Sequence, residues 1–364
     1  MKKGRYAHCF LFVGLLCLCF LAVAARPALS AEVIRMSYAN FFPPTHEMSK
    51  LSEAFCREAE KRSNGRLAIT FHPAGSVLTA PRMYDGVVKK IVDIGYSHAE
   101  YTRGKFAVSE TLSLPLGYPS GWVATKVAND FYNEFKPKEW DETHPLYFHN
   151  GGTGAIQSTK PVRKLEDFKG IKLRAPGATA DVVKALGGTP RDTPMAETYD
   201  GISKGVLDGS MTSLETLKGW KFAEVCKYAT DCWEVGIVYP WYVVMNKSSW
   251  NALPADLKKM FTDLSTEWAE KRGRAWDDIN AEGVDHAVKM GLEVIRLSPQ
   301  EGKRWEKAVE PLEEEYVKKM VTKGVPADQS KKQIAFAKER IAYWTKKQIE
   351  LGIKSPTGPA EMRK

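Results

Sequence analysis

Residues Lys164–Pro176 read KLEDFKGIKLRAP. The apolar pattern around Ile171 predicts a short strand that ends at Arg174, because the following proline cannot continue the hydrogen bonding of a strand. A guanidinium at that position is always charged and presents a fork of N–H donors that matches a carboxylate. A surface strand with a solvated arginine is the other interpretation, and this stretch alone does not separate the two.

The N-terminal part of the sequence is typical of an exported protein. A basic start and an apolar run over residues 9–25 are followed by small residues near position 30. This order predicts a signal peptide, residues 1–31, that is cleaved on export to the periplasm. A membrane anchor is the competing interpretation, but the run is short for a span and Pro27 follows it. We therefore expect no membrane-embedded part after cleavage.

Removal of the signal peptide lowers the net charge. The whole chain carries +9, and residues 1–31 hold four basic residues and no acidic one, so +5 remains. Much of this excess lies in lysines of the expected C-terminal helices, a pattern typical of solvated helix faces. Because an exported protein of mild charge rarely meets nucleic acid, we expect no nucleic-acid partner.

Length and cysteine content constrain the fold further. Subtracting 31 residues from 364 leaves 333, more than one hydrophobic core comfortably holds, so two lobes are expected. An oxidising compartment allows one disulfide among Cys56, Cys226 and Cys232. The short spacing favours a Cys226–Cys232 bond with Cys56 as a free thiol, and a bond from Cys56 to either of them stays open. The chain has no metal-ligand spacing, and no metal or cofactor is expected.

Hydrophobic periodicity predicts an α/β fold. Strands are expected at residues 33–39, 67–71 and 92–96, with helices at 45–65 and 79–91 between them. This alternation implies a mainly parallel sheet covered by helices. A second series of strands follows from residue 146 onward. Beyond Pro254 a long amphipathic helix is expected to run to about Met290, weakened at Gly273 and Gly283.

The glycine-rich loop Asn150–Gly154 follows an expected strand. A phosphate-binding loop is one interpretation, but the GxGxxG pattern and the P-loop lysine are both missing. A hinge or crossover loop is favoured, because glycine lets the backbone turn. His46, His72 and His98 are interpreted as ordinary structural histidines. No local pattern marks a catalytic nucleophile, although catalytic triads need not be local in sequence.

A second distinctive segment is Pro194–Gly209. It predicts a capped helix and then the glycine-flanked turn Gly205–Gly209. The run Ser210–Ser213 after the turn offers hydroxyl and backbone N–H groups to a ligand. A plain loop is the alternative interpretation.

Taken together, Lys164–Pro176, Pro194–Gly209, Pro44–His46 and Phe71–Gly75 resemble the DctP-type solute-binding proteins of TRAP (tripartite ATP-independent periplasmic) transporters. The resemblance runs from Val33 to the last expected helix. It implies an α/β, two-lobed periplasmic binding protein fold with mainly parallel sheets, crossing hinge strands and a long lobe-spanning helix. We expect lobe I over residues 32–150 and about 241–255 and lobe II over 151–240. Residues 256–364 would form the long helix and C-terminal helices that pack on both lobes.

The resemblance also implies a ligand site between the lobes. Arg174 matches the arginine that binds the ligand's carboxylate in this family, and Thr212 falls near the family's ligand-binding asparagine. The remaining residues expected at the site are Asn150 and Thr153 for polar contacts, Asn40 and Phe42 for closure from lobe I, and Trp220, Trp241 and Tyr239 for contact with the ligand body.

This chain departs from the family pattern at two places. Ser210–Ser213 stands where many members have glutamine-glutamate-asparagine-proline, and no arginine lies near Gly154. The second departure argues against a dicarboxylate ligand. One arginine with aromatic walls suits a monocarboxylate that has a flat or apolar body.

The sequence therefore predicts a binding protein and not an enzyme. It would capture an organic acid and deliver it to the membrane subunits of an ion-gradient-driven TRAP transporter. Three alternatives remain: the binding protein of an ATP-driven transporter, which would lack the long spanning helix; a periplasmic enzyme that acts on a small acid; and a ligand-presenting partner of a sensor kinase.

Overall fold

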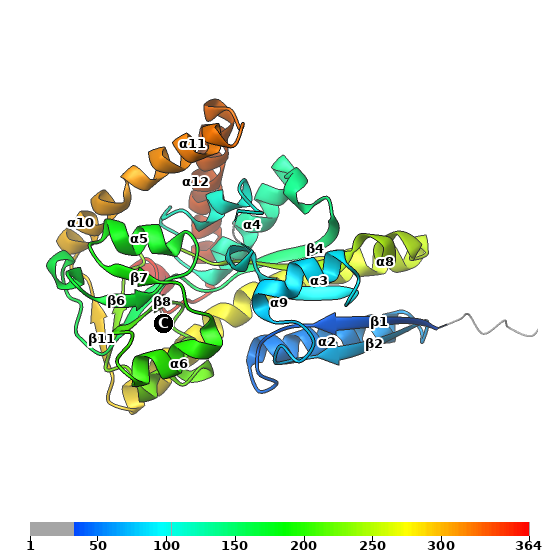
Figure 1. Cartoon of the computed structure of the whole chain (residues 1–364), viewed down its shortest axis with the longest axis horizontal. Coiled ribbons are helices and arrows are strands. Elements are labelled where there is room, and N and C mark those ends of the chain that lie inside the picture. The colour runs from blue at the N-terminus through cyan, green and yellow to red at the C-terminus, as the bar shows by residue number, and fades with distance from the viewer. Residues whose placement is uncertain (1–32, 103, 364) are drawn as a thin grey trace, which may run out of the picture. The chain divides into compact units, whose positions relative to one another are not determined.

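The computed structural model describes residues 33–102 and 104–363, and Figure 1 shows their helices and strands. From Arg35 onward they form one compact unit. The predicted signal peptide, residues 1–31, lies outside the described residues. None of the described helices is both long and apolar enough to cross a membrane.

The first sheet has the strand order β2-β1-β3-β10-β4. Its strands are β1 (Ile34–Ala39), β2 (Leu67–His72), β3 (Ile94–His98), β4 (Thr143–Asn150) and β10 (Pro240–Asn246). β1 and β3 are parallel, whereas β10 runs antiparallel to both of its neighbours. The strand–helix alternation expected over residues 33–96 is confirmed, with α2 (Glu47–Arg62) and α3 (Met83–Val88) as its helices.

The second sheet has the strand order β11-β9-β5-β8-β6-β7. Its strands are β5 (Ala155–Ser158), β6 (Lys172–Arg174), β7 (Thr189–Arg191), β8 (Gly209–Thr212), β9 (Tyr228–Asp231) and β11 (Glu293–Arg296). β6 is parallel to β7 and β8, and β9 is parallel to β11. β5 runs antiparallel to β8 and β9. The expected α/β fold is thus present, and its parallel pairs are joined by β5 and β10, which run against both of their neighbours.

Further helices surround the sheets. They are α4 (Gly121–Phe135), α5 (Thr179–Ala185), α6 (Met195–Ser203), α7 (Thr216–Gly219), α8 (Lys247–Ala252), α9 (Ala255–Lys289), α10 (Pro299–Val309), α11 (Pro311–Thr322) and α12 (Ala327–Glu350). Short 3-10 turns lie at Ala80–Arg82, Ala99–Tyr101, Ser109–Ser113, Lys138–Trp140, Leu165–Phe168, Phe222–Glu224 and Ala360–Met362. α12 packs on α4, whereas α10 and α11 pack on α5.

Two segments outside helices and strands carry the chain between the two sheets. Residues 151–154 lead from β4 to β5, and residues 232–239 lead from β9 back to β10. The two crossings touch, since the Gly154 N–H donates to the Ile237 carbonyl at 2.9 Å. A Cβ added to Gly154 would lie 2.7 Å from Cγ1 of Ile237, so this position has no room for an arginine side chain. The glycine-rich loop is a crossover, as the sequence predicted.

α9 is the long helix predicted after Pro254, and Figure 1 shows it in yellow. It packs on α2, α4 and β4 at the first sheet and on α7 and β11 at the second. The helix is continuous through Gly273 and Gly283, where we expected it to weaken. A Cβ on Gly283 would lie 2.3 Å from the Leu214 carbonyl oxygen, and a Cβ on Gly273 would lie 3.2 Å from Cβ of Thr125. These glycines therefore allow the segments around Leu214 and Thr125 to pack closely against the helix.

The strands divide between the sheets in the order that the expected lobes require, with β11 as an addition. The sequence predicts no strand between the long helix, which was expected to end at about Met290, and the helices that follow it. Residues 293–296 adopt a strand conformation because their backbone pairs with β9 at the edge of the sheet. This pairing joins segments that are far apart in the sequence, so the local pattern does not reveal it. The residue boundaries of the lobes stay a prediction.

β8 begins at Gly209, the last residue of the turn that the sequence marks as Gly205–Gly209. In the antiparallel pairing of β5 with β8, Ser158 faces Gly209. A Cβ added to Gly209 would lie 2.1 Å from the Gln157 carbonyl oxygen. Since no pair of non-bonded atoms approaches that closely, only glycine fits here while the two strands stay paired.

The predicted Cys226–Cys232 disulfide is wrong, because all three described cysteines are free and buried. β9 (Tyr228–Asp231) lies between the two residues and carries them apart. A strand rises roughly 3.3 Å per residue, so this strand alone separates its ends by about 10 Å. The Cα atoms of a disulfide must lie within about 7 Å of each other. Cys232 instead directs its thiol to the Gly154 carbonyl at 3.3 Å.

A buried carboxylate joins α9 to the start of α4. Asp277 on α9 accepts the backbone N–H groups of Gly121 at 2.8 Å and Trp122 at 3.1 Å. Burial raises the pKa of Asp277 from 3.8 to about 7 and outweighs these two donors, which favour the ionised form. The long helix is thus tied to the first sheet's covering helix by a group that titrates near neutral pH.

We expect three reactive thiols, those of Cys56, Cys226 and Cys232, when the protein without residues 1–31 is unfolded in the absence of reductant. In the folded protein these thiols should react slowly with a thiol reagent, since they are buried and burial raises the pKa of each. A spectroscopic thiol titration before and after unfolding measures both. A single reactive thiol after unfolding would contradict the free cysteines.

The raised pKa of Asp277 predicts a pH-dependent stability. Because the folded state holds this proton up to about pH 7 and the unfolded state releases it near pH 3.8, the contribution is complete below the lower value and is lost as the pH rises through the higher one. Relative to Asp277→Asn, the wild type should lose about 1–3 kcal/mol of unfolding free energy between pH 5 and pH 8. Denaturant titration checks this.

Asp285→Asn, at an exposed position farther along the same helix, is the matched control for this experiment. A constant stability difference between wild type and Asp277→Asn across this pH range would contradict the prediction.

Candidate ligand-binding site

A small cavity of about 20 Å³ lies where elements of the two sheets face each other. Its lining residues are Phe41, Phe42, His98, Tyr101 and Trp241 from the first sheet and its loops, Tyr239 from the crossing segment, and Arg174, Met195, Thr212, Ser213, Glu215 and Trp220 from the second sheet and its helices. The space holds about one water molecule. A larger ligand therefore enters only when the walls move apart.

Arg174 supplies the positive charge of the cavity. It ends β6, and its side chain is nearly fully buried. Its Nε donates to the Thr193 carbonyl and its Nη2 to the Tyr101 hydroxyl, each at 3.0 Å. Among the ion pairs of the described residues, none involves Arg174. A buried charge without a counter-charge is costly, so the free N–H groups of this guanidinium are suited to an anion.

His98 provides a neutral hydrogen-bond donor beside Arg174. It ends β3, and its Nδ1 accepts the Glu100 N–H at 3.1 Å, which leaves the ring proton on Nε2. Burial, together with the charge of Arg174, holds the pKa of His98 well below its usual value. The ring therefore stays neutral and adds no second positive charge.

Trp241 lines the cavity and carries an unsatisfied donor, which lies beside Gly151. Its Nε1 is buried, and no hydrogen-bond partner for it exists among the described residues. The ring stacks on Phe41 with centroids 5.9 Å apart and meets His98 edge-on at 4.7 Å. An unpaired buried N–H is unfavourable, and an oxygen atom of a ligand would satisfy it.

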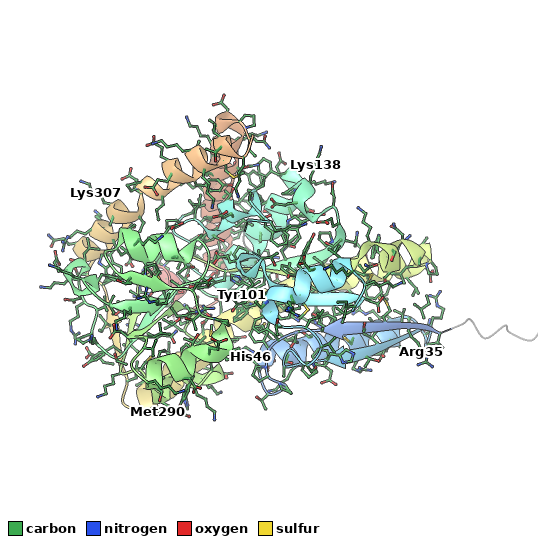
Figure 2. The ribbon with its side chains drawn as sticks, viewed as in Figure 1. Arg35, His46, Tyr101, Lys138, Met290 and Lys307 are labelled. Atoms are coloured by element: carbon green, nitrogen blue, oxygen red, sulfur yellow. The ribbon has the colours of Figure 1, made fainter. Side chains whose placement is uncertain are left out.

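A hydrogen bond between His46 and Glu215 crosses from the first sheet's side to the second's. His46 caps α2, because its Nδ1 accepts the Met48 N–H at 3.1 Å. Its Nε2 therefore carries the proton and donates to Oε2 of Glu215 at 3.0 Å. Figure 2 labels His46 and Tyr101 where the elements of the two sheets face each other. Both cross-sheet contacts, Tyr101 with Arg174 and His46 with Glu215, thus border the same cavity.

Six of the nine residues that the sequence proposed for the site line the cavity. They are Arg174, Thr212, Phe42, Trp220, Trp241 and Tyr239. Tyr239 is held in place by its hydroxyl, which donates to the Met211 carbonyl at 2.6 Å. Burial raises the pKa of this phenol, so it stays neutral.

The other three proposed residues do not line the cavity, because backbone groups of neighbouring segments engage their side chains. Asn40 accepts the Phe42 N–H at 3.0 Å and shapes the loop before α2. Asn150 donates to the Ala124 carbonyl at 2.9 Å, and Thr153 donates to the Tyr118 carbonyl at 2.8 Å. These polar side chains hold the first crossing and the loop before α2 in place, and they do not contact the cavity.

Sequence reasoning missed five lining residues: Phe41, His98, Tyr101, Met195 and Glu215, whereas Ser213 belongs to the run Ser210–Ser213 that the sequence offered to a ligand. One signal was available, because ligands of α/β sheets gather at the carboxyl ends of strands. His98 ends β3 just as Arg174 ends β6, so strand position could have marked it. No local pattern marked Tyr101 or Glu215, whose positions depend on contacts across the two sheets.

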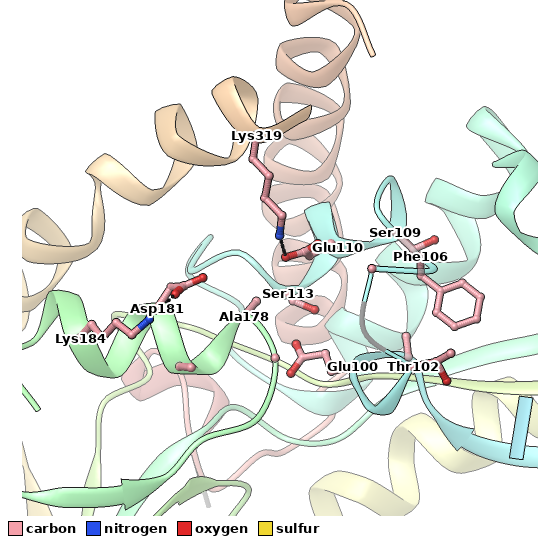
Figure 3. A pocket seen from close by; sticks show the side chains of 14 residues that line it. Glu100, Thr102, Phe106, Ser109, Glu110, Ser113, Ala178, Asp181, Lys184 and Lys319 are labelled. Atoms are coloured by element: carbon pink, nitrogen blue, oxygen red, sulfur yellow. Dashed lines mark hydrogen bonds and ion pairs between the residues drawn. The ribbon is translucent and has the colours of Figure 1, made fainter. Parts of the chain in front are cut away.

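A larger pocket of about 250 Å³ borders the same region, and Figure 3 shows it. Both of its lysines are already paired: Lys319 contacts Glu110, and Lys184 contacts Asp181 at 3.3 Å. These lysines are neutralised in place, in contrast to Arg174. The cavity beside Arg174 is therefore the better candidate for an acidic ligand.

Comparisons with known proteins agree on one family. The sequence model described as bacterial extracellular solute-binding protein, family 7 (DctP) matches residues 38–320. A monocarboxylate 2-oxoacid-binding periplasmic protein of Nostoc sp. is 24% identical over 266 residues, which cover 68% of this chain and 70% of the relative.

Solved structures share the fold. A TRAP periplasmic solute-binding protein from Desulfovibrio salexigens is 33% identical, with a TM-score of 0.75 over 85% of this chain and 96% of that one. A TRAP solute-binding protein from Rhodoferax ferrireducens, in complex with copurified benzoate, has a TM-score of 0.80 at 23% identity, over 86% of this chain and 99% of that one. Because the family model covers most of this chain, and a structure at 33% identity spans nearly all of its described part, the chain belongs to family 7 of the bacterial extracellular solute-binding proteins, the DctP-type TRAP proteins.

Proposed function

We propose that this protein captures an organic acid whose carboxylate binds Arg174. The buried guanidinium without an ion pair carries this proposal. Two of its hydrogen bonds, to Thr193 and Tyr101, orient the fork, and its remaining N–H groups can form a bidentate pair with a carboxylate. The Desulfovibrio salexigens relative supports this, since the C-terminus of a symmetry mate occupies its ligand-binding site and a chain terminus carries a carboxylate.

The ligand is proposed to be a monocarboxylate with an aromatic or otherwise flat, apolar body. Phe41, Phe42, Trp220 and Trp241 supply ring faces to the cavity, and such walls favour a planar apolar group. The unsatisfied Nε1 of Trp241 would meet an acceptor oxygen of the ligand. The benzoate complex and the 2-oxoacid-binding relative are consistent with this class of ligand.

Capture is proposed to work by closure of two lobes about the crossing segments, residues 151–154 and 232–239. The cavity takes walls from both sheets, so a ligand makes its full set of contacts only in the closed form. Opening would separate Tyr101, on the side of the first sheet, from Arg174, on the side of the second sheet. We propose the lobe boundaries given from the sequence as the moving parts.

Delivery is proposed to be to the membrane subunits of a TRAP transporter in the periplasm, after cleavage of residues 1–31. The long helix α9 favours this over an ATP-driven transporter, whose binding proteins are expected to lack such a helix. Binding without chemical change is part of the proposal. Recovery of the bound acid unchanged would support it, and turnover would favour a periplasmic enzyme.

Arg174→Ala should weaken acid binding by at least about 100-fold, because truncation of one partner of a buried charge pair costs several kcal/mol. Arg174→Lys should give an intermediate loss, since it keeps the charge but not the fork. Acids found by a thermal-shift screen would be titrated by calorimetry against each variant. At about 100 times its dissociation constant, a ligand should add roughly 2.7 kcal/mol of stability to the wild type.

The matched control is Arg191→Ala, since Arg191 faces Arg174 across the β6–β7 pair but is exposed. It should bind the acid normally. The proposal fails if Arg174→Ala, shown to be folded by its unfolding transition, also binds normally. If no acid shifts the wild type, the screen is repeated after unfolding and refolding to remove any acid carried from the expression host.

A further inference from the structure

The cavity contains a negative charge that the proposed function leaves unused. Glu215 follows β8 and is nearly fully buried, and it lines the same cavity as Arg174. Its Oε2 accepts the Nε2–H of His46, whose Nδ1 is occupied by the Met48 N–H. A ring with an acceptor at Nδ1 holds only one proton and is neutral. The pair therefore keeps the full negative charge of the carboxylate.

Arg174 and Glu215 lie at the two ends of a row of aromatic rings. The row runs in order through Tyr101, Phe41, Phe42 and His46, with neighbouring ring centroids 5.8, 4.6 and 4.5 Å apart. Arg174 donates to the first member of the row, and the last member donates to Glu215. The positive and negative groups are thus separated by apolar rings, and none of the ion pairs between described residues joins them.

We propose that Glu215 determines specificity by excluding a second carboxylate from the end of the site away from Arg174. This rests on the proposed function, since it assumes that the ligand's carboxylate occupies Arg174. In a space with little water, two like charges repel strongly, whereas a hydroxyl or amide of a ligand donates to the carboxylate. The site then selects monocarboxylates, and among these it prefers acids with a hydrogen-bond donor at the far end.

Glu215 also links the two sides of the cavity through His46. A purely structural link would affect the closed form, and so every ligand, to the same degree. A specificity role changes the ratio between two ligands of the same shape and different charge. The ratio therefore separates the two roles.

The probes are terephthalate and 4-carbamoylbenzoate, which have nearly the same shape and differ by one negative charge, with benzoate as the reference acid. Calorimetry on the wild type should show 4-carbamoylbenzoate binding at least tenfold more tightly than terephthalate. Glu215→Gln should reduce this preference at least tenfold, through tighter binding of terephthalate. Glu47→Gln is the matched control, because Glu47 adjoins His46 but does not line the cavity.

The wild-type comparison tests the inference even if Glu215→Gln does not fold. Equal affinity of the wild type for the two probes overturns the inference, and so does a Glu215→Gln variant that weakens both alike. Binding of benzoate that depends on Arg174, together with either of those results, leaves the proposed function intact. Failure of all three acids to bind overturns the inference together with the proposed aromatic class of ligand, and capture of an acid by Arg174 is then decided by the wider screen.

Discussion

Two crossing segments and one long helix connect the two sheets of this protein, and the position of the site follows from that constraint. The crossings touch through the Gly154–Ile237 hydrogen bond, and α9 packs on elements of both sheets. Any relative motion of the sheets must therefore centre on the crossings. The cavity lies beside them, with Tyr239 from the second crossing in its wall, so the closure proposed above would need only a small rotation there.

Among the described residues two arginines are buried, and their surroundings differ. Arg272 on α9 donates to the hydroxyls of Tyr147 at 3.0 Å and Ser52 at 2.7 Å, and its guanidinium lies 4.5 Å from the ring centre of Tyr96. These partners all belong to the first sheet and α2, so Arg272 fastens the long helix there. Within the described part of the chain Arg174 has fewer partners and faces a cavity, which leaves donors for a molecule from outside.

Local sequence patterns predict much of the architecture, but they predict only part of the site. Strand and helix periodicity predicted the first sheet's order of elements, the long helix after Pro254 and the placement of Arg174 at a strand end, because these depend on neighbouring residues. The antiparallel strands β5 and β10, the edge strand β11 and the unbonded Cys226 and Cys232 depend on how distant segments pair. Glu215 could not be proposed as a site residue from the sequence, because its contact with His46 joins segments that are far apart in the chain.

The same distinction applies to the turn that ends at Gly209. Its glycine is required because a Cβ would lie where β5 places the Gln157 carbonyl oxygen. The glycine at the end of the turn is thus required by the pairing of β5 with β8 and does not depend on which ligand the protein binds. The positions that line the cavity, Thr212, Ser213 and Glu215, lie just beyond this pairing requirement, so they can serve the ligand without disturbing it.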